Sequence, residues 1–334
     1  MTLMSVPVID ISPFRSGTPA QKAEVAAQVA QACTDIGFLV ISGHGIADDL
    51  ISRMYRATKS FFEGPLENKL AVARPEAGQI RGYSGVEQEG LGLLEDQPAP
   101  PDLKESYDIG PLDAPADDYH QAEAAGAHFA PNVWPTGVED FEPAYRAYYQ
   151  AMEGLTLEML EIFASALDLP HDYFVDKVDK HISILRTNYY PPQLTEPKPN
   201  QIRGGAHSDY TAMTILWQED VEGGGLQVEN KAGEWVDVPV VPGTFVVNLG
   251  DSLERWTNDS WVSTMHRVVN PPHEIARTQS RISIPYFVQP NYDAVIECIP
   301  TCFDDENPAK YEPMRNGEYL YMKFTQQNTL AAAE

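Results

Sequence analysis

The spacing of hydrophobic residues predicts helices through most of the first half of the chain. Apolar residues recur every three or four positions over 18–35, 47–63 and 138–168, which is the period of an amphipathic helix. Two short apolar runs bounded by turn residues, VPVIDIS (6–12) and GFLVISGHGI (37–46), predict strands between these helices.

From residue 180 onward the pattern is typical of a β protein. A stretch rich in Pro, Gly, Ala and acidic residues, 76–136, reads as a long loop, and an apolar pattern over 311–330 predicts a final helix. Short segments rich in β-branched and aromatic residues, separated by turn residues, predict a jelly roll. These segments are HISILRTNYY, AMTILWQ, GLQVEN, EWVDVPV, TFVVNLGD, VSTMHRVV and RISIPYFVQP.

No linker composition interrupts the chain, so we expect a single α+β domain over 1–334. Its core would be a double-stranded β-helix (jelly roll) over 181–300, with flanking N-terminal helices. The mostly helical region 1–180 would pack on this core, and 301–334 would form a C-terminal helical lid. An apolar content of 43% is sufficient for a substantial core.

The charge of the chain narrows the range of partners. The formal net charge is −26, and such a surface repels nucleic acid and anionic membranes. The N-terminus lacks the features of a signal peptide, and no stretch approaches the ~20 apolar residues of a membrane helix. Three cysteines, Cys33, Cys298 and Cys302, favour reduced thiols. We therefore expect a cytoplasmic monomer or homodimer that binds a small molecule.

The motif HSD (207–209) opens a predicted strand and carries the first candidate chemistry. Side chains at i and i+2 of a strand point to the same face, so His207 and Asp209 would project together. His266 follows 57 residues after Asp209 in another predicted strand, and a jelly roll can bring such strands together. Two imidazoles and a carboxylate make the facial triad of non-haem iron(II) oxygenases, and they also suit zinc. Alone, the motif also fits a surface turn capped by Asp209.

A second pair of polar residues follows in RIS (281–283). Arg281 and Ser283 would share one strand face, where a guanidinium and a hydroxyl can bind a carboxylate. Arg277 is a rival for this role, but it lacks a serine two positions later. Asp251 precedes an apparent short helix and reads as its N-cap, and His44, in a glycine turn, reads as a structural histidine.

Taken in order, HSD, His266 and RIS resemble the iron(II)/2-oxoglutarate-dependent oxygenases of the isopenicillin N synthase-like family. VPVIDIS, GFLVISGHGI, LRTNYYPP (185–192) and HRVVNP extend this resemblance over nearly the whole chain. The 15 residues from His266 to Arg281 are more than is usual in the family, because PPHEIARTQ lengthens a hairpin.

The resemblance implies a set of site residues. His207, Asp209 and His266 would bind Fe(II), and Arg281 and Ser283 would bind the distal carboxylate of 2-oxoglutarate. Near the keto-acid end of 2-oxoglutarate the family pattern places Asn188 and Tyr190 of the NYY run.

The resemblance also implies an activity. With Fe(II), 2-oxoglutarate and dioxygen, the enzyme would oxidise a small molecule of specialised metabolism and release succinate and CO₂. The outcome would be hydroxylation, or desaturation, epoxidation or ring formation. The alternatives are a 2-oxoglutarate-independent iron oxidase of the isopenicillin N synthase type, a zinc hydrolase and a non-catalytic binding protein.

Substrate contacts are expected from the variable segments 81–110, 193–205 and 317–324. Arginines in or near these segments would meet a polar or anionic substrate group, and aromatic residues would form pocket wall or core. The candidate substrate residues are Arg81, Tyr83, Arg186, Trp217 and Phe287.

Overall fold

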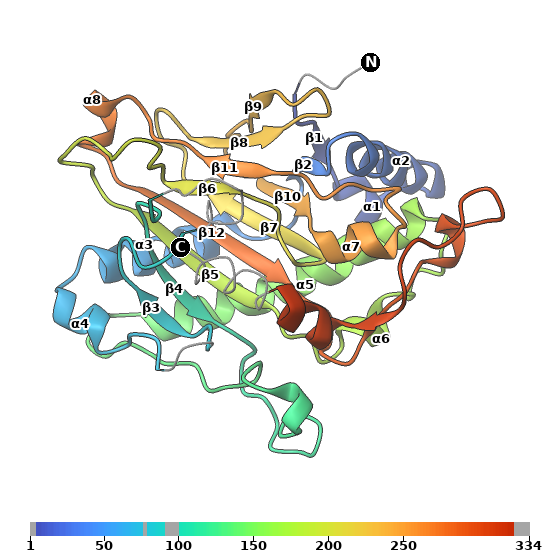
Figure 1. Cartoon of the computed structure of the whole chain (residues 1–334), viewed down its shortest axis with the longest axis horizontal. Coiled ribbons are helices and arrows are strands. Elements are labelled where there is room, and N and C mark those ends of the chain that lie inside the picture. Colours follow the sequence, from blue (N-terminus) through green and yellow to red (C-terminus); the bar gives the residue numbers. More distant parts are fainter. Residues whose placement is uncertain (1–4, 76–78, 91–99, 324–334) are drawn as a thin grey trace.

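A computed structural model describes residues 5–75, 79–90 and 100–323, and two β-sheets dominate it (Figure 1). The larger sheet has the strand order β1-β2-β10-β7-β12-β5-β4-β3, and the smaller has the order β6-β11-β8-β9. The strands of the larger sheet are β1 (Val8–Asp10), β2 (Phe38–Ser42), β10 (Phe245–Leu249), β7 (Met213–Gln218), β12 (Arg281–Val288), β5 (Ile184–Tyr190), β4 (Glu105–Ile109) and β3 (Gly82–Ser84). Those of the smaller sheet are β6 (Gly204–His207), β11 (His266–Val268), β8 (Leu226–Glu229) and β9 (Trp235–Asp237).

A cluster of hydrophobic side chains lies between the two sheets. Alternate residues of β2 serve different sides, because Phe38 and Val40 face the smaller sheet whereas Leu39 and Ile41 face the helices. The cluster between the sheets combines side chains of β2, β10 and β8. Two layers of strands packed in this way, with helices on one face, form an α+β jelly roll, and the predicted fold class is confirmed.

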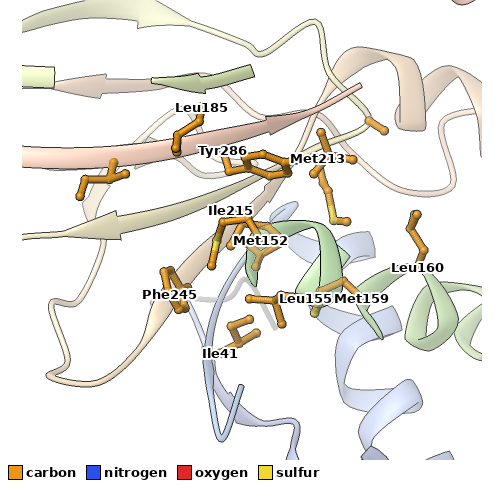
Figure 2. Close-up of a cluster of buried hydrophobic side chains, with 14 of the residues drawn as sticks. Ile41, Met152, Leu155, Met159, Leu160, Leu185, Met213, Ile215, Phe245 and Tyr286 are labelled. Atoms are coloured by element: carbon orange, nitrogen blue, oxygen red, sulfur yellow. The ribbon is translucent and has the colours of Figure 1, made fainter. Parts of the chain in front are cut away.

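Helices cover the outer face of the larger sheet. The longest, α5 (Phe141–Ala166), lies across it with Met152 packed beside Ile215 and Phe245 (Figure 2). A capping box formed by Thr18 and Gln21 starts α2 (Pro19–Asp35). The other regular elements are α1 (Ser12–Ser16), α3 (Asp48–Phe62), α4 (Leu66–Leu70), η2 (Glu123–Ala125), α6 (Val175–Val178), α7 (Asp251–Trp256), α8 (His273–Ala276), β13 (Val295–Ile296), η3 (Pro300–Cys302) and β14 (Met314–Arg315).

The prediction of one long loop over 76–136 is wrong, because this stretch contributes β3 and β4 to the larger sheet. Strand β4 has the sequence ESYDI. Its two acidic residues interrupt the run of apolar residues by which a buried strand is normally predicted. All five of its residues are buried. Its two carboxylates can be buried because each is paired with a cation: Glu105 accepts a hydrogen bond from Lys69, and Asp108 accepts one from Arg186. Paired charges thus extend the sheet by two strands.

The C-terminal prediction is partly correct. Residues 314–315 are a strand paired with β13, and the helix begins after them and runs through 316–323. The remainder of the expected helix, 324–330, lies outside the described residues.

We expect the packing of α5 on the sheet to be a main source of stability. Met152 is fully buried, so Met152→Ala should lower the free energy of unfolding by about 2–4 kcal/mol through lost burial and the cavity left behind. Leu157, on the same helix but 50% exposed, provides the matched control, and Leu157→Ala should change it by less than about 1 kcal/mol. Urea denaturation followed by circular dichroism would measure both, and equal losses would contradict this packing.

Candidate active site

A cavity of about 220 Å³ lies between the two sheets at the end that the hydrophobic cluster leaves open. Strands β5, β7 and β12 line it on one side, and β6, β8 and β11 line it on the other. Leu320 of the helix over 316–323 also contributes to its wall.

His207 and His266 stand opposite each other on paired strands of the smaller sheet. Strands β6 and β11 are antiparallel with His266 in register with His207, and the two rings lie 4.3 Å apart. The prediction that Asp209 shares a strand face with His207 is wrong, because β6 ends at His207 and Asp209 lies in the loop after it. Its Oδ1 nevertheless lies 3.7 Å from Nε2 of His207 and 3.8 Å from Nε2 of His266. One ligand atom from each residue falls within 4.8 Å of the others, so the three could hold one metal ion.

Hydrogen bonds orient all three side chains. Nδ1 of His207 lies 2.8 Å from the carbonyl of Gly205, and Nδ1 of His266 lies 3.2 Å from that of Thr264. A carbonyl only accepts, so each Nδ1 carries the proton and each Nε2 presents a lone pair.

The carboxylate of Asp209 is held in a similar way. Its Oδ2 accepts hydrogen bonds from Thr214 Oγ1 (2.6 Å) and Asn248 Nδ2 (2.8 Å), which leaves Oδ1 toward the two imidazoles. Sequence reasoning missed Thr214 and Asn248, because a polar residue on a buried strand reveals its partner only when the strands are placed.

The charge states suit a divalent cation. Burial, followed by the neighbouring His266, lowers the pKa of His207 to about 3 and keeps its imidazole neutral. Burial would raise the pKa of Asp209, but His266, His207 and the hydrogen bonds from Thr214 and Asn248 outweigh it and lower that pKa. Two imidazoles and one carboxylate face a single point.

Arg281 is fully buried outside the described lining of the cavity, and it has unused donors. It donates to Gln218 Oε1 (3.1 Å), whereas its Nε and Nη1 are buried without a hydrogen-bond partner in the described structure. Ser283 and Asn188 lie opposite each other on β12 and β5 and are joined at 3.4 Å, and both line the cavity. Buried donors without acceptors are costly, so this corner fits a bound anion.

The remaining members of the predicted set lie in different places. Tyr190 lines the cavity and its ring lies 5.2 Å from Cζ of Arg281, and Phe287 lines the cavity as well. Tyr83 and Trp217 lie outside the described lining. The hydroxyl of Tyr83 donates to Glu105, and Trp217 packs against Tyr55 on the helical side.

Arg186 lines the cavity, but its guanidinium nitrogens already donate hydrogen bonds to carboxylates of the protein. Its Nε and Nη2 bind both carboxylate oxygens of Asp108, and its Nη1 and Nη2 reach Glu89. Arg186 therefore acts as a buried cross-link between β5, β4 and the segment that carries Glu89.

Arg81 is only 2% exposed and donates to the carbonyls of Ile80, His128 and Ala130. It lies in the wall of a neighbouring cavity of about 490 Å³, outside the described lining of the cavity at the triad. Its guanidinium ties the chain around residue 128 to β3.

Two further residues can be placed. His44 is structural as expected, because one ring nitrogen accepts from Ile46 N and the other donates to the Gly243 carbonyl. The prediction that Asp251 is an N-cap is wrong, since Gly250 occupies that position. The Asp251 carboxylate instead accepts from Ser263 Oγ and Lys323 Nζ, both at 2.7 Å, and so holds the helix over 316–323 beside the cavity.

Comparisons with known proteins agree with this geometry. Residues 6–137 match the family model of the non-haem dioxygenase in morphine synthesis N-terminal region, and 181–290 match that of the 2OG-Fe(II) oxygenase superfamily. The chain is 35% identical to a 2-oxoglutarate-Fe(II) type oxidoreductase (hxnY) of Emericella nidulans, over 92% of this chain and 86% of that protein.

The chain belongs to the iron(II)/2-oxoglutarate-dependent oxygenases. It is 31% identical to a homoarginine-6-hydroxylase of Oryza sativa over 96% of both chains. The crystal structure of a full-length Neurospora crassa protein in complex with alpha-KG and thymine matches with a TM-score of 0.82 and 33% identity, covering 98% of this chain and 97% of that one. The oxygenase therefore depends on Fe(II), 2-oxoglutarate and dioxygen and acts on a small molecule. Within the described residues, no helix is long and apolar enough to cross a membrane.

The environment of Arg81 gives a first test of its role. Arg81→Met removes its hydrogen bonds to three backbone carbonyls and should lower the free energy of unfolding by about 2–4 kcal/mol. Arg56→Met, at an exposed position on α3, should leave it unchanged. Urea denaturation measures the loss. Unchanged stability together with a raised KM for substrate would instead place Arg81 against the substrate.

Proposed function

We propose that His207, Asp209 and His266 hold the Fe(II) of this oxygenase, and that Arg281 and Ser283 bind the distal carboxylate of 2-oxoglutarate. The observation that carries this assignment is the convergence of Nε2, Nε2 and Oδ1 from the three residues within 4.8 Å in a buried cavity. Asn188 and Tyr190 would complete the cosubstrate wall, and Oδ1 of Asn188 is buried with no partner among the described residues.

When bound, Fe(II) would supply the oxidising chemistry by which dioxygen, 2-oxoglutarate and the substrate are converted to succinate, CO₂ and the oxidised substrate. The protein orients and shields the reactants. Thr214 and Asn248 fix the carboxylate of Asp209, while the carbonyls of Gly205 and Thr264 fix the two rings. Apolar side chains of the cavity wall, including Phe287 and Leu320, exclude water from the substrate.

The same cavity also distinguishes the proposed function from its alternatives. An iron oxidase that needs no 2-oxoglutarate would leave the donors of Arg281 for its substrate, and a zinc hydrolase would not need them at all. The alpha-KG bound to the Neurospora crassa protein favours the 2-oxoglutarate-dependent activity. A non-catalytic binding protein has no use for three converging ligands.

We expect the Fe(II)-loaded protein to form succinate from 2-oxoglutarate, and His207→Ala and Asp209→Ala to reduce that rate at least about 100-fold by removing a metal ligand. His171→Ala, at an exposed histidine, is the matched control and should keep the full rate. Succinate is measured by mass spectrometry. Substrate oxidation without added 2-oxoglutarate would point to the iron oxidase, and activity with Zn(II) alone would point to the hydrolase.

We propose further that the substrate is a small, neutral molecule with an N–H group. Apart from the triad, the charged residues that line the cavity, Lys104, Asp108 and Arg186, are each paired within the protein. Gln289 also lines the cavity, and its Oε1 is buried without a hydrogen-bond partner in the described structure. A substrate N–H would satisfy this oxygen. Thymine, which is bound in the Neurospora crassa structure, is a small neutral ring with N–H groups. By analogy with the relative that is a hydroxylase, we propose hydroxylation as the outcome.

A panel of candidate substrates tests this class. Pyrimidine bases and other cyclic amides should stimulate succinate formation more than amino acids, and Gln289→Leu should raise KM for the best of them about tenfold or more. Gln28→Leu, on the exposed side of α2, is the control. Stronger stimulation by a charged amino acid, or an unchanged KM in Gln289→Leu, would contradict the proposal.

The charge of −26 also leads us to propose that the oxygenase acts in the cytoplasm, binds no nucleic acid and is a monomer or homodimer. Cys33, Cys298 and Cys302 are free cysteines in the structure, which fits that location.

A further inference from the structure

A second buried arginine, Arg203, stands beside Arg281. Arg203 directly precedes β6 of the smaller sheet, whereas Arg281 begins β12 of the larger one. The guanidinium carbons of Arg203 and Arg281 lie 5.6 Å and 5.2 Å from the centroid of the same ring, that of Tyr190. The two sheets thus each contribute one cation to the same corner of the barrel.

The charge of Arg203 is not balanced by the surrounding protein. The residue is 2% exposed, and its Nε is buried without a hydrogen-bond partner in the part of the chain that the structure describes. Among the described residues, no carboxylate lies within ion-pair distance of Arg203. Burial lowers its pKa to about 10, and the neighbouring charge of Arg281 acts in the same direction.

Arg281 does not relieve this imbalance. Its hydrogen bond goes to the neutral amide of Gln218, and two of its donor atoms have no partner among the described residues. The carboxylate of Glu219 attracts Arg281 from beyond ion-pair distance, and its two oxygens accept hydrogen bonds from the Tyr55 hydroxyl and the Ile282 backbone instead. Two buried guanidinium groups with spare donors therefore need an anion that the described protein does not provide.

We propose that Arg203 is a second cation for the distal carboxylate of 2-oxoglutarate and that, with Arg281, it selects dicarboxylic over monocarboxylic 2-oxo acids. This inference rests on the cosubstrate role proposed above for Arg281 and Ser283. A carboxylate has enough lone pairs to accept from both guanidinium groups and from Ser283. The ring of Tyr190 lies close to both guanidinium groups.

The test compares binding of two 2-oxo acids that differ only at the distal end. Calorimetric titration of the Fe(II)-loaded protein without oxygen gives Kd for 2-oxoglutarate and for 2-oxopentanoate, which has a methyl group in place of the distal carboxylate. We expect Arg203→Met to weaken 2-oxoglutarate about tenfold or more and to leave 2-oxopentanoate within about twofold. Arg203→Lys, which keeps the charge, should lose less.

Two further measurements separate a binding role from a packing role. Without cosubstrate, Arg203→Met should unfold at the same or a higher urea concentration, because it removes an unbalanced buried charge. Arg277→Met, at an exposed arginine, is the matched control and should change neither binding nor stability. An unchanged preference for 2-oxoglutarate in Arg203→Met, with or without lower stability, would overturn the inference.

Arg281→Met distinguishes failure of this inference from failure of the proposed cosubstrate role. If Arg281→Met loses the preference and Arg203→Met keeps it, only the role of Arg203 is wrong. If the unaltered protein binds both acids equally, the assignments of Arg281 and Arg203 both fail.

Discussion

The antiparallel pairing of β6 with β11 is the constraint on which the site depends. It sets His207 opposite His266 and brings their rings to 4.3 Å. Between this pair and the pairing of Val268 with Gly204, β6 contains one residue more than β11, so the register shifts. Such a bulge re-aims side chains locally. A slip of one residue elsewhere in this pairing would turn one imidazole away from the cavity, because side chains alternate between faces.

Buried charge is the second feature that organises the molecule. Along β4 and β5, carboxylates and cations are paired within the protein, as in the bidentate bond of Arg186 to Asp108. Ion pairs of this kind add little net stability compared with apolar packing, but breaking one leaves a costly unpaired charge. They therefore fix which strands lie side by side. Beside Tyr190, Arg203 and Arg281 have no such partners among the described residues, and that contrast is what marks a ligand site.

Some parts of the fold and the site can be predicted from the sequence, and others depend on contacts between residues distant in the chain. Hydrophobic period gave the three main helices and the jelly-roll strands, because burial of one face imposes that period. The RIS motif was accessible because the two-residue spacing of a strand is local. HSD was accessible as a motif, but the shared strand face predicted for it was wrong, since His207 ends β6 and Asp209 lies in the loop that follows. Strands β3 and β4 were not, since Glu105 and Asp108 are buried only through partners distant in the chain. Arg203 was missed for the same reason: four positions before His207 it looks like any loop arginine.

Charge is distributed unevenly around the cavity. Strand β6 leads from Arg203 to His207, roughly 13 Å at the usual rise per residue, while β12 leads from Arg281 past Ser283 to Phe287. The corner beside Tyr190 is cationic, with Arg203 and Arg281 outside the described lining, whereas Phe287, Gln289 and Leu320 form a neutral part of the cavity wall. With the roles proposed here, the dianionic cosubstrate gains the most electrostatic binding energy at the cationic corner. A neutral substrate loses the least binding energy at the neutral part of the wall. Coulomb energy in a buried site is large enough to keep the two from exchanging places. The same strands that hold the metal ligands therefore determine which reactant lies on which side of them.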